Sequence, residues 1–312
     1  MEIIFTEPIY KDYIWGGYRL KKDLNKNTPF EKTAESWEIS CNSNGICIIK
    51  NGEYAGTLLS DLYADISKKE MIFGTNCNKY NEFPILIKFI DAMNNLSIQV
   101  HPDDEYAKSI GLPNGKNEMW YIIDCAKDSK LVAGMNKALN KEELRNVIEN
   151  DKIKDYLNYV TVKQGDSVYI PAGTLHAILS NILICEIQQN SDTTYRVYDW
   201  DRVDKNGNSR QLHKKEAIDT INPKYVSTIT HSNNDEIQKL ASNNVFEVNK
   251  IVCKNKYEST TSASSFEAYC VVNGSGTIDD ISIKQGDSFI IPACYGKFKI
   301  LGNIELLKTI VK

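Results

Sequence analysis

An eleven-residue segment occurs twice in this chain. Residues 162–172 read VKQGDSVYIPA and residues 283–293 read IKQGDSFIIPA, so eight of the eleven positions are identical at an offset of 121 residues. Gly-Asp between two apolar runs predicts a tight turn between strands, and the proline then ends the second strand where its missing N–H is tolerated. The repeat therefore predicts two similar β units, and 312 residues are enough for two domains of about 150 residues each.

Most other periodic segments also predict strands, because they are short, rich in Ile, Val and Tyr, and bounded by Gly, Asn or Asp. We expect strands at residues 85–91, 96–101, 119–124, 130–133, 159–163, 167–170, 183–188, 195–198, 269–272 and 288–292. Helical signals are fewer and lie at 57–66, 140–157 and 213–220, of which the second starts with an Asn cap and an acidic first turn. The balance is mainly β with a small helical insertion.

The two copies of the repeat differ directly after the shared proline. The first continues as GTLH over residues 173–176, whereas the second continues as CYGK over residues 294–297, so His176 aligns with Lys297. A histidine ring nitrogen can bind a metal, but a lysine ammonium has no lone pair at neutral pH. We therefore expect a metal site in the first unit and no equivalent site in the second.

Charge and cysteine content exclude several classes of protein. The 37 Lys and Arg against 41 Asp and Glu give a net charge of −4, which provides no electrostatic basis for binding nucleic acid or an anionic membrane. The eight cysteines are scattered and contain no C-x-x-C pair, unlike a secreted disulfide scaffold or a zinc knuckle. We expect reduced, packed cysteines.

The location that follows is the cytoplasm. The first residues include acidic side chains and lack the basic region of a signal peptide. The longest apolar stretch, 83–92, is interrupted by Lys88 and Asp91 and is far shorter than the ~18 residues of a membrane span. The sequence carries no signal for the oligomeric state.

Four side chains form the candidate metal site. Gln99 and His101, in LSIQVHPDD (96–104), are two residues apart on a predicted strand and so face the same side. Glu118 starts another strand, and His176 follows the first repeat. Two neutral imidazoles, one amide and one carboxylate leave a divalent metal with about +1, which suits a Lewis acid that stabilises an oxygen anion. This donor set is compatible with Zn²⁺, Fe²⁺, Mn²⁺ and Co²⁺.

A second polar cluster follows the repeat. Glu186 and Gln188 share one strand face, as do Arg196 and Tyr198. An arginine among aromatic residues is costly to bury unless it meets an anion. The anion is either an internal partner such as Asp199 or a substrate phosphate or enediolate. The two remaining histidines, at 213 and 231, lie in polar sequence, and we expect both to be solvated.

The strand–GD–strand–PxG…H unit is similar to the second motif of the cupin barrel, so the chain resembles a double cupin of two β-barrel or jelly-roll units. QVHPDD, KNEMWY, PAGTLHAI and EIQQNSDTTYRVYDWDR, with IWGG (14–17) and AESWEIS (34–40), resemble the signature segments of class I, zinc-dependent mannose-6-phosphate isomerases, particularly the short bacterial form. The resemblance runs from about Glu7 to Lys312. It implies one Zn²⁺ per chain at Gln99, His101, Glu118 and His176, and a catalytic arginine at Arg196.

The implied reaction interconverts mannose 6-phosphate and fructose 6-phosphate through a cis-enediol, with a small sugar phosphate as the only expected partner. Lys116 and Lys88 are the candidates for contacting its phosphate. Glu186, a metal-bound water and Lys116 all remain candidates for carrying the proton. We expect residues 1–232 to form the catalytic region with the helical insertion, and 233–312 a cupin-like unit without metal ligands.

Two other functions are compatible with parts of the pattern. A cupin dioxygenase would use iron held by two histidines and one glutamate. A non-catalytic sugar-phosphate-binding regulator would keep Lys116 and Arg196 without needing a metal. The fourth candidate ligand Gln99 and the cation Arg196 favour isomerisation over oxygen chemistry, and the intact ligand set argues against the regulator.

Overall fold

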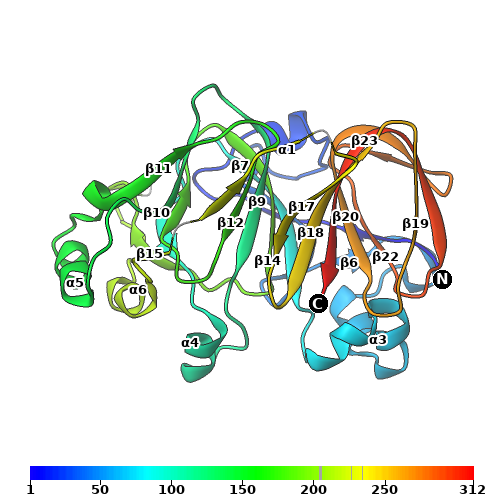
Figure 1. Ribbon diagram of the computed structural model, residues 1–312, viewed down its shortest axis with the longest axis horizontal. Helices are drawn as coiled ribbons and strands as arrows, with labels where there is room; N and C mark the ends of the chain where they lie inside the picture. The colour runs from blue at the N-terminus through cyan, green and yellow to red at the C-terminus, as the bar shows by residue number, and fades with distance from the viewer. Residues whose placement is uncertain (204–205, 226, 234) are drawn as a thin grey trace.

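The computed structural model describes residues 1–203, 206–225, 227–233 and 235–312. Two β units stand side by side, with short helices on the flank of the first unit and below both (Figure 1). The helices are α1 Arg19–Lys22, α2 Leu59–Ala64, α3 Ile66–Phe73, α4 Asp104–Ser109, α5 Lys141–Glu149 and α6 Lys214–Thr220. Of the described helices, none is both long and apolar enough to span a membrane.

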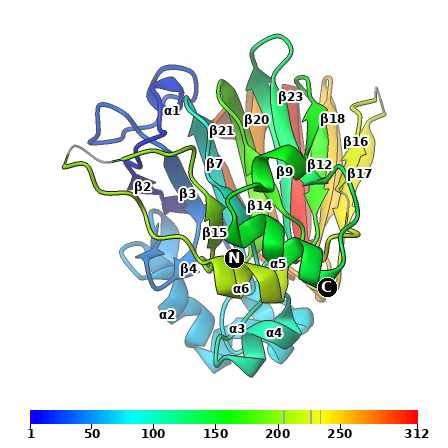
Figure 2. The same cartoon turned by 90° about the vertical axis from the view of Figure 1, so that its left-hand side faces the viewer.

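The first unit is built from two sheets. Over the described residues, a seven-stranded sheet has the order β16-β12-β9-β14-β7-β3-β2 and a five-stranded sheet the order β11-β10-β13-β8-β15. Figure 2 shows α5 and α6 in front of this unit. Its strands are β2 Ile9–Lys11, β3 Glu35–Ile39, β7 Ile85–Ala92, β8 Ile98–Val100, β9 Glu118–Cys125, β10 Lys130–Met135, β11 Leu157–Thr161, β12 Ser167–Ile170, β13 His176–Ile178, β14 Ile182–Gln189, β15 Tyr195–Tyr198 and β16 Thr228–Thr230.

The second unit is dominated by one curved sheet of nine described strands, in which β19 and β21 branch from the path β17-β18-β23-β20-β22-β1-β6. Its strands are β1 Ile4–Glu7, β6 Ile48–Ile49, β17 Ile237–Ser242, β18 Phe246–Cys253, β19 Lys256–Thr260, β20 Glu267–Ile278, β21 Ile281–Lys284, β22 Ser288–Ile291 and β23 Lys297–Val311. A small separate hairpin pairs β4 Cys41–Asn42 with β5 Gly45–Ile46.

The repeat forms the same structure in both units, which confirms the predicted pair of β units. Gly165 and Gly286 both adopt positive φ, at 86° and 93°. The carboxylate of the following aspartate accepts a hydrogen bond from the backbone N–H three residues earlier, at 3.0 Å in the first copy and 2.9 Å in the second. The next strand then pairs antiparallel with a long central strand, β12 with β9 and β22 with β20.

The copies diverge because the second contains an additional left-handed residue. Gly173 and Cys294 adopt positive φ at the same place, but Gly296 adds a further positive φ of 98° before β23 begins. Lys297 consequently lies exposed at the surface, while Phe298 is buried in the apolar core of the second unit. Lys297 therefore begins its strand as His176 does, but His176 is buried and Lys297 is exposed.

One hydrophobic cluster joins the two units. It contains Ile87 and Cys185 from the first sheet together with Phe246, Ala268 and Leu307 from the second. The N-terminal strand β1 is also hydrogen-bonded to β22, so the region before residue 232 contributes a strand to the C-terminal sheet. The division at 232/233 stays a prediction. All eight cysteines are free.

Every predicted strand is present, and the helices are shorter than predicted. The segment 57–66 contains α2, and 213–220 contains α6. The segment 140–157 holds α5, whose Asn140 and Glu143 form a reciprocal capping box, but Asp151 adopts a φ of +56° soon after the last turn. The remainder forms a short 3-10 turn, Ile153–Tyr156, and then enters β11.

Candidate active site in the first barrel

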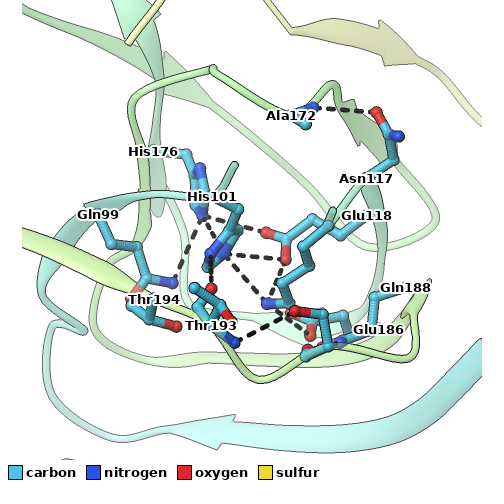
Figure 3. Close-up of polar contacts among 12 residues, drawn as sticks. Gln99, His101, Asn117, Glu118, Ala172, His176, Glu186, Gln188, Thr193 and Thr194 are labelled. Carbon is cyan, nitrogen blue, oxygen red and sulfur yellow. Dashed lines mark hydrogen bonds and ion pairs between the residues drawn. The ribbon is translucent and has the colours of Figure 1, made fainter. Parts of the chain in front are cut away.

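Both walls of the first barrel bring side chains to one point, as Figure 3 shows. His176 on β13 is the direct register partner of Gln99 on β8, and Gln99 is in turn the partner of Arg196 on β15. His101 follows β8 directly, and Glu118 begins β9 in the facing sheet. The four predicted ligands are thus brought together by strand register and alternation.

The ligand atoms lie at the separations that a tetrahedral metal site requires. The two imidazole Nε2 atoms are 3.1 Å apart. Glu118 places Oε2 3.3 Å from His101 Nε2 and Oε1 3.2 Å from His176 Nε2. Four ligands at about 2.1 Å from a zinc ion would be about 3.4 Å from one another. His101, Glu118 and His176 are therefore positioned to hold one metal ion.

Backbone carbonyls orient both imidazoles. His101 Nδ1 is 2.8 Å from Thr193 O, and His176 Nδ1 is 2.8 Å from Thr174 O. An Nδ1–H donated to a carbonyl leaves the Nε2 lone pair facing inward. Burial, helped by the charge of Lys116, lowers the pKa of His101 to about 3, and burial also lowers the pKa of His176. Both rings are neutral and able to bind a metal.

Glu118 carries the charge that a cation would meet. Burial raises the pKa of this carboxyl group, but the charge of Lys116 holds it well below its usual range. Lys116 Nζ lies 2.7 Å from Oε2, yet both carboxylate oxygens are buried without an aligned hydrogen bond. An ionised carboxylate with unused lone pairs in a buried site fits a metal ion.

Gln99 lies beside this cluster. Its carboxamide Nε2 is 3.4 Å from His176 Nε2, and its Oε1 is 3.4 Å from Ser97 Oγ. The two ends of a carboxamide exchange by rotation of the terminal torsion, which would turn the oxygen toward the imidazoles. The residue is therefore placed where an amide oxygen can complete the ligand set.

A second row of side chains crosses the seven-stranded sheet. Trp37, Lys88, Glu186 and Trp120 are successive register partners on β3, β7, β14 and β9. Lys88 Nζ lies 3.0 Å from Glu186 Oε1 and 3.4 Å from Glu35 Oε2. The Trp120 indole donates to Glu186 Oε2 at 2.8 Å. The row puts a carboxylate between a buried cation and an indole.

Lys116 connects the second row to the metal ligands. It lies 3.1 Å from His101 Nε2 and 3.8 Å from Glu186 Oε1, in addition to its pair with Glu118. Lys88 and Lys116 are both buried and both ion-paired, in contrast to free surface lysines. Burial raises the pKa of Glu186, as do the neighbouring carboxylates, while the two lysines oppose the shift.

A cavity of about 330 Å³ opens beside these groups. Its aromatic wall is formed by Tyr13, Trp15 and Trp37, and Gln99 and the two lysines line it as well. The full lining comprises Tyr13, Trp15, Glu35, Trp37, Lys88, Ile90, Leu96, Ser97, Gln99, Lys116, Ile178, Glu186, Asp192, Thr194, Arg196 and Arg210.

Arg196 faces this cavity rather than an internal anion. Its Nε donates to Ser97 Oγ at 3.3 Å and its Nη1 to Gln211 O at 2.9 Å. Asp199, the internal partner considered above, instead binds the guanidinium groups of Arg202 and Arg210. The alternative of an Arg196–Asp199 ion pair was therefore wrong.

The prediction for His213 also needs correction. This residue is half-buried: its backbone N–H donates to Arg196 O at 2.8 Å, and Arg196 N donates to its Nδ1 at 3.2 Å. The segment that contains His213 therefore lies along β15 and forms hydrogen bonds with its backbone. His231 is exposed as expected and contacts Asp166 at 2.9 Å.

Sequence reasoning missed three charged residues of the cavity, Glu35, Asp192 and Arg210. Glu35 and Asp192 lie inside segments that carry the family resemblance. Their positions, near an aromatic residue and at a strand end respectively, were the signals that could have identified them. Arg210 lies in a polar connection without periodicity, and its place depends on tertiary contacts alone.

Two β barrels, one of which holds a buried His–Glu–His cluster beside a polar cavity, define the chain as a double cupin with a metal site. The family model "Phosphomannose isomerase type I, catalytic domain" matches residues 4–136, and "Mannose-6-phosphate isomerase, cupin domain" matches residues 236–311. The chain belongs to the type I mannose-6-phosphate isomerase family, a metal-dependent family, and this membership supports the isomerase rather than the dioxygenase or regulator.

Relatives match over nearly the whole chain. A probable mannose-6-phosphate isomerase of Bacillus subtilis, GmuF, is 38% identical, with 97% of this chain and 98% of that protein covered. A mannose-6-phosphate isomerase of Streptococcus mutans is 36% identical over 99% and 98%. The crystal structure of the mannose 6-phosphate isomerase from Bacillus subtilis superposes with a TM-score of 0.85 at 34% identity, covering 99% of each chain.

Proposed function

We propose that this chain interconverts mannose 6-phosphate and fructose 6-phosphate, using one Zn²⁺ held by Gln99, His101, Glu118 and His176. The observation that carries the proposal is the position of the buried His–Glu–His cluster next to a cavity lined by Glu186, the two lysines and Arg196, in a member of this family. A bound divalent metal supplies Lewis acidity to oxygen atoms of the sugar.

We propose Glu186 as the proton carrier. Its Oε2 accepts from the Trp120 indole, whereas its Oε1 is buried without an aligned hydrogen bond and lies next to the two lysines. A carboxyl group whose pKa is raised by burial is better matched to proton transfer near neutral pH than an exposed one. Glu186 would take the proton from C2 of the aldose and return it to C1 of the cis-enediol.

Arg196 would stabilise the oxygen that becomes negative during this transfer. It lies on the same register row as Gln99 and His176, and its guanidinium is already fixed by Ser97 Oγ and Gln211 O. A preorganised donor of this kind costs no reorganisation when charge develops. Lys88 and Lys116 remain proposed substrate-facing residues, which also hold Glu186 between two cations.

The proposal includes a compartment and a partner. The substrate is a small sugar phosphate, and a reduced cytoplasm suits eight free cysteines, most of them buried. We also propose the division into a catalytic region, residues 1–232, and a C-terminal cupin-like unit, residues 233–312.

The decisive experiment is a coupled assay for fructose 6-phosphate formed from mannose 6-phosphate, before and after removal of metal by a chelator. Activity should disappear with the metal and return with about one equivalent of Zn²⁺ per chain. Isomerase activity that survives complete metal removal would contradict the metal-dependent mechanism. Oxygen consumption without isomerisation would support the dioxygenase instead.

A further inference from the structure

We propose that Arg210 binds the phosphate group of the substrate beside Arg196, and that this residue sets the preference for a phosphorylated over a neutral sugar. The inference rests on the proposed isomerase function and assigns a residue that lies outside the segments carrying the family resemblance. The geometry of the cavity supports this inference because the cations at one end are fully paired with carboxylates, whereas those at the other end are not.

At the end near the seven-stranded sheet, positive charge is already matched. Lys88 contacts Glu186 and Glu35, and Lys116 contacts Glu118 and Glu186. A phosphate dianion entering this end would meet three buried carboxylates. Like charges at these distances repel strongly in a buried site.

At the opposite end, cations exceed carboxylates. Arg196 lacks a carboxylate partner within ion-pair distance among the described residues. Arg210 and Arg202 share the carboxylate of Asp199, and both donate a hydrogen bond to its Oδ1. Two guanidinium groups therefore share Asp199 and a third, that of Arg196, is unpaired, so that three cations exceed the carboxylates of Asp199 and of the cavity residue Asp192. The excess positive charge fits a dianion.

Backbone contacts hold Arg210 next to Arg196. The carbonyl of Gln211, the following residue, accepts from Arg196 Nη1, and His213 pairs with the Arg196 backbone. Asp199 accepts from Arg210 Nε at 2.7 Å and from Nη2 at 2.6 Å. Arg210 Nη1 and Arg196 Nη2 have no hydrogen bond to any described residue, so both keep donors for a ligand in the cavity they line.

The spacing along the barrel suits the substrate. Arg196 is two register partners away from His176, through Gln99, and adjacent strands are about 4.8 Å apart. The backbones of His176 and Arg196 are therefore about 10 Å apart along the barrel wall, with Gln99 between them. An extended hexose phosphate could place C1 and C2 at the metal, within reach of Arg196, and its phosphate at Arg210.

The test compares zinc-loaded wild type, Arg210→Ala and Arg210→Lys, with Arg145→Ala on the exposed face of α5 as the matched control. The ratio of kcat/KM for mannose 6-phosphate to that for mannose is measured for each protein. In Arg210→Ala this ratio should fall roughly tenfold or more, the loss expected for a charge-assisted hydrogen bond. Arg210→Lys should fall less, and Arg145→Ala should keep the ratio.

A second measurement needs no turnover. Inorganic phosphate is titrated calorimetrically onto the same zinc-loaded proteins, and its dissociation constant should rise by a similar factor in Arg210→Ala. Unchanged phosphate binding and an unchanged substrate ratio would overturn the inference. So would loss of zinc in both Arg210 variants, because the residue would then be structural. Arg210-dependent phosphate binding in a wild type that does not isomerise would support the site while refuting the proposed function.

Discussion

Gln99 and Arg196 are direct register partners on β8 and β15, which puts the proposed metal site and the proposed catalytic cation on one row of the barrel. We expect Arg196→Ala to retain zinc, because Arg196 touches none of the other three ligands. Its kcat should fall about 10²–10³-fold, since one preorganised donor contributes ~2.7–4 kcal/mol. Steady-state kinetics with metal analysis tests this, and a change confined to KM would reassign Arg196 to ground-state binding.

Replacing His176 should remove metal and activity together. His176 is buried, and its Nε2 lies 3.1 Å from His101 Nε2, so His176→Ala leaves too few ligands for tight binding. His231→Ala is the control, because the His231 side chain is exposed and contacts the turn residue Asp166, away from the metal cluster. Zinc content by elemental analysis and the coupled assay are the measurements. A variant that is fully active without bound zinc would refute the assignment.

The proton transferred between C2 and C1 should exchange with protons of the solvent. A carboxylate such as Glu186 that carries a proton between C2 and C1 can exchange it with water before returning it. Turnover of mannose 6-phosphate in D₂O should therefore place deuterium at C1 of fructose 6-phosphate, detectable by NMR. Complete absence of label at early and late times would instead favour a direct hydride shift.

The repeat glycines should differ in their tolerance of alanine. Both need positive φ, but a Cβ on Gly286 would lie 2.5 Å from the Leu24 carbonyl oxygen, whereas a Cβ on Gly165 would lie 2.9 Å from Ser232 Cβ, which is a smaller overlap. Gly56→Ala, with positive φ and open space around it, isolates the backbone cost of about 1–2 kcal/mol. Urea unfolding should rank the loss as Gly286 above Gly165 above Gly56; equal losses would exclude a steric contribution.

Acid should remove the stabilisation that Asp199 provides. Burial raises the pKa of Asp199, but hydrogen bonds from Arg210 and Arg202 lower it below its usual value. A carboxyl group whose pKa is lowered by folding stabilises the protein at pH values above its unfolded-state pKa of about 3.9. This stabilisation is lost as the pH falls through the folded-state pKa. The Tm of the wild type should be higher than that of Asp199→Asn, and this difference should be larger at pH 7 than at pH 3.

The control for this pH experiment is Asp12→Asn, which changes an exposed aspartate far along the chain from the arginine cluster. At pH 7 this substitution should change the Tm less than Asp199→Asn does. An Asp199→Asn difference that is the same at both pH values would show that the carboxylate charge does not stabilise the fold.

Local patterns were sufficient to predict the ligand strands. Alternation put Gln99 and His101 on one face, and the repeat located β12 and β22, because turn chemistry and period-two patterning act within a few residues. The exposure of Lys297 was not predicted in this way. The left-handed Gly296 precedes it, whereas Leu175, at the aligned place in the first copy, has no positive φ.

Contacts between distant segments were not predictable in this way. Arg196 could be recognised as a cation seeking an anion, but its neighbour Arg210 and the half-buried His213 reach β15 only through the folded path of the connection after Asp199. The ion pairs of Lys88 and Lys116 likewise depend on which strands become neighbours. Such partners are selected by topology, and no local periodicity records them.

The pairing of β1 with β22 has a consequence for biosynthesis. The strand Ile4–Glu7 is synthesised long before its partner Ser288–Ile291, so the two can pair only late in synthesis. Sheets that close through such distant contacts fold slowly and expose unpaired edges while they wait. The catalytic barrel can assemble earlier, so truncation near the C-terminus should yield a nascent chain with an orphaned N-terminal edge and a tendency to aggregate.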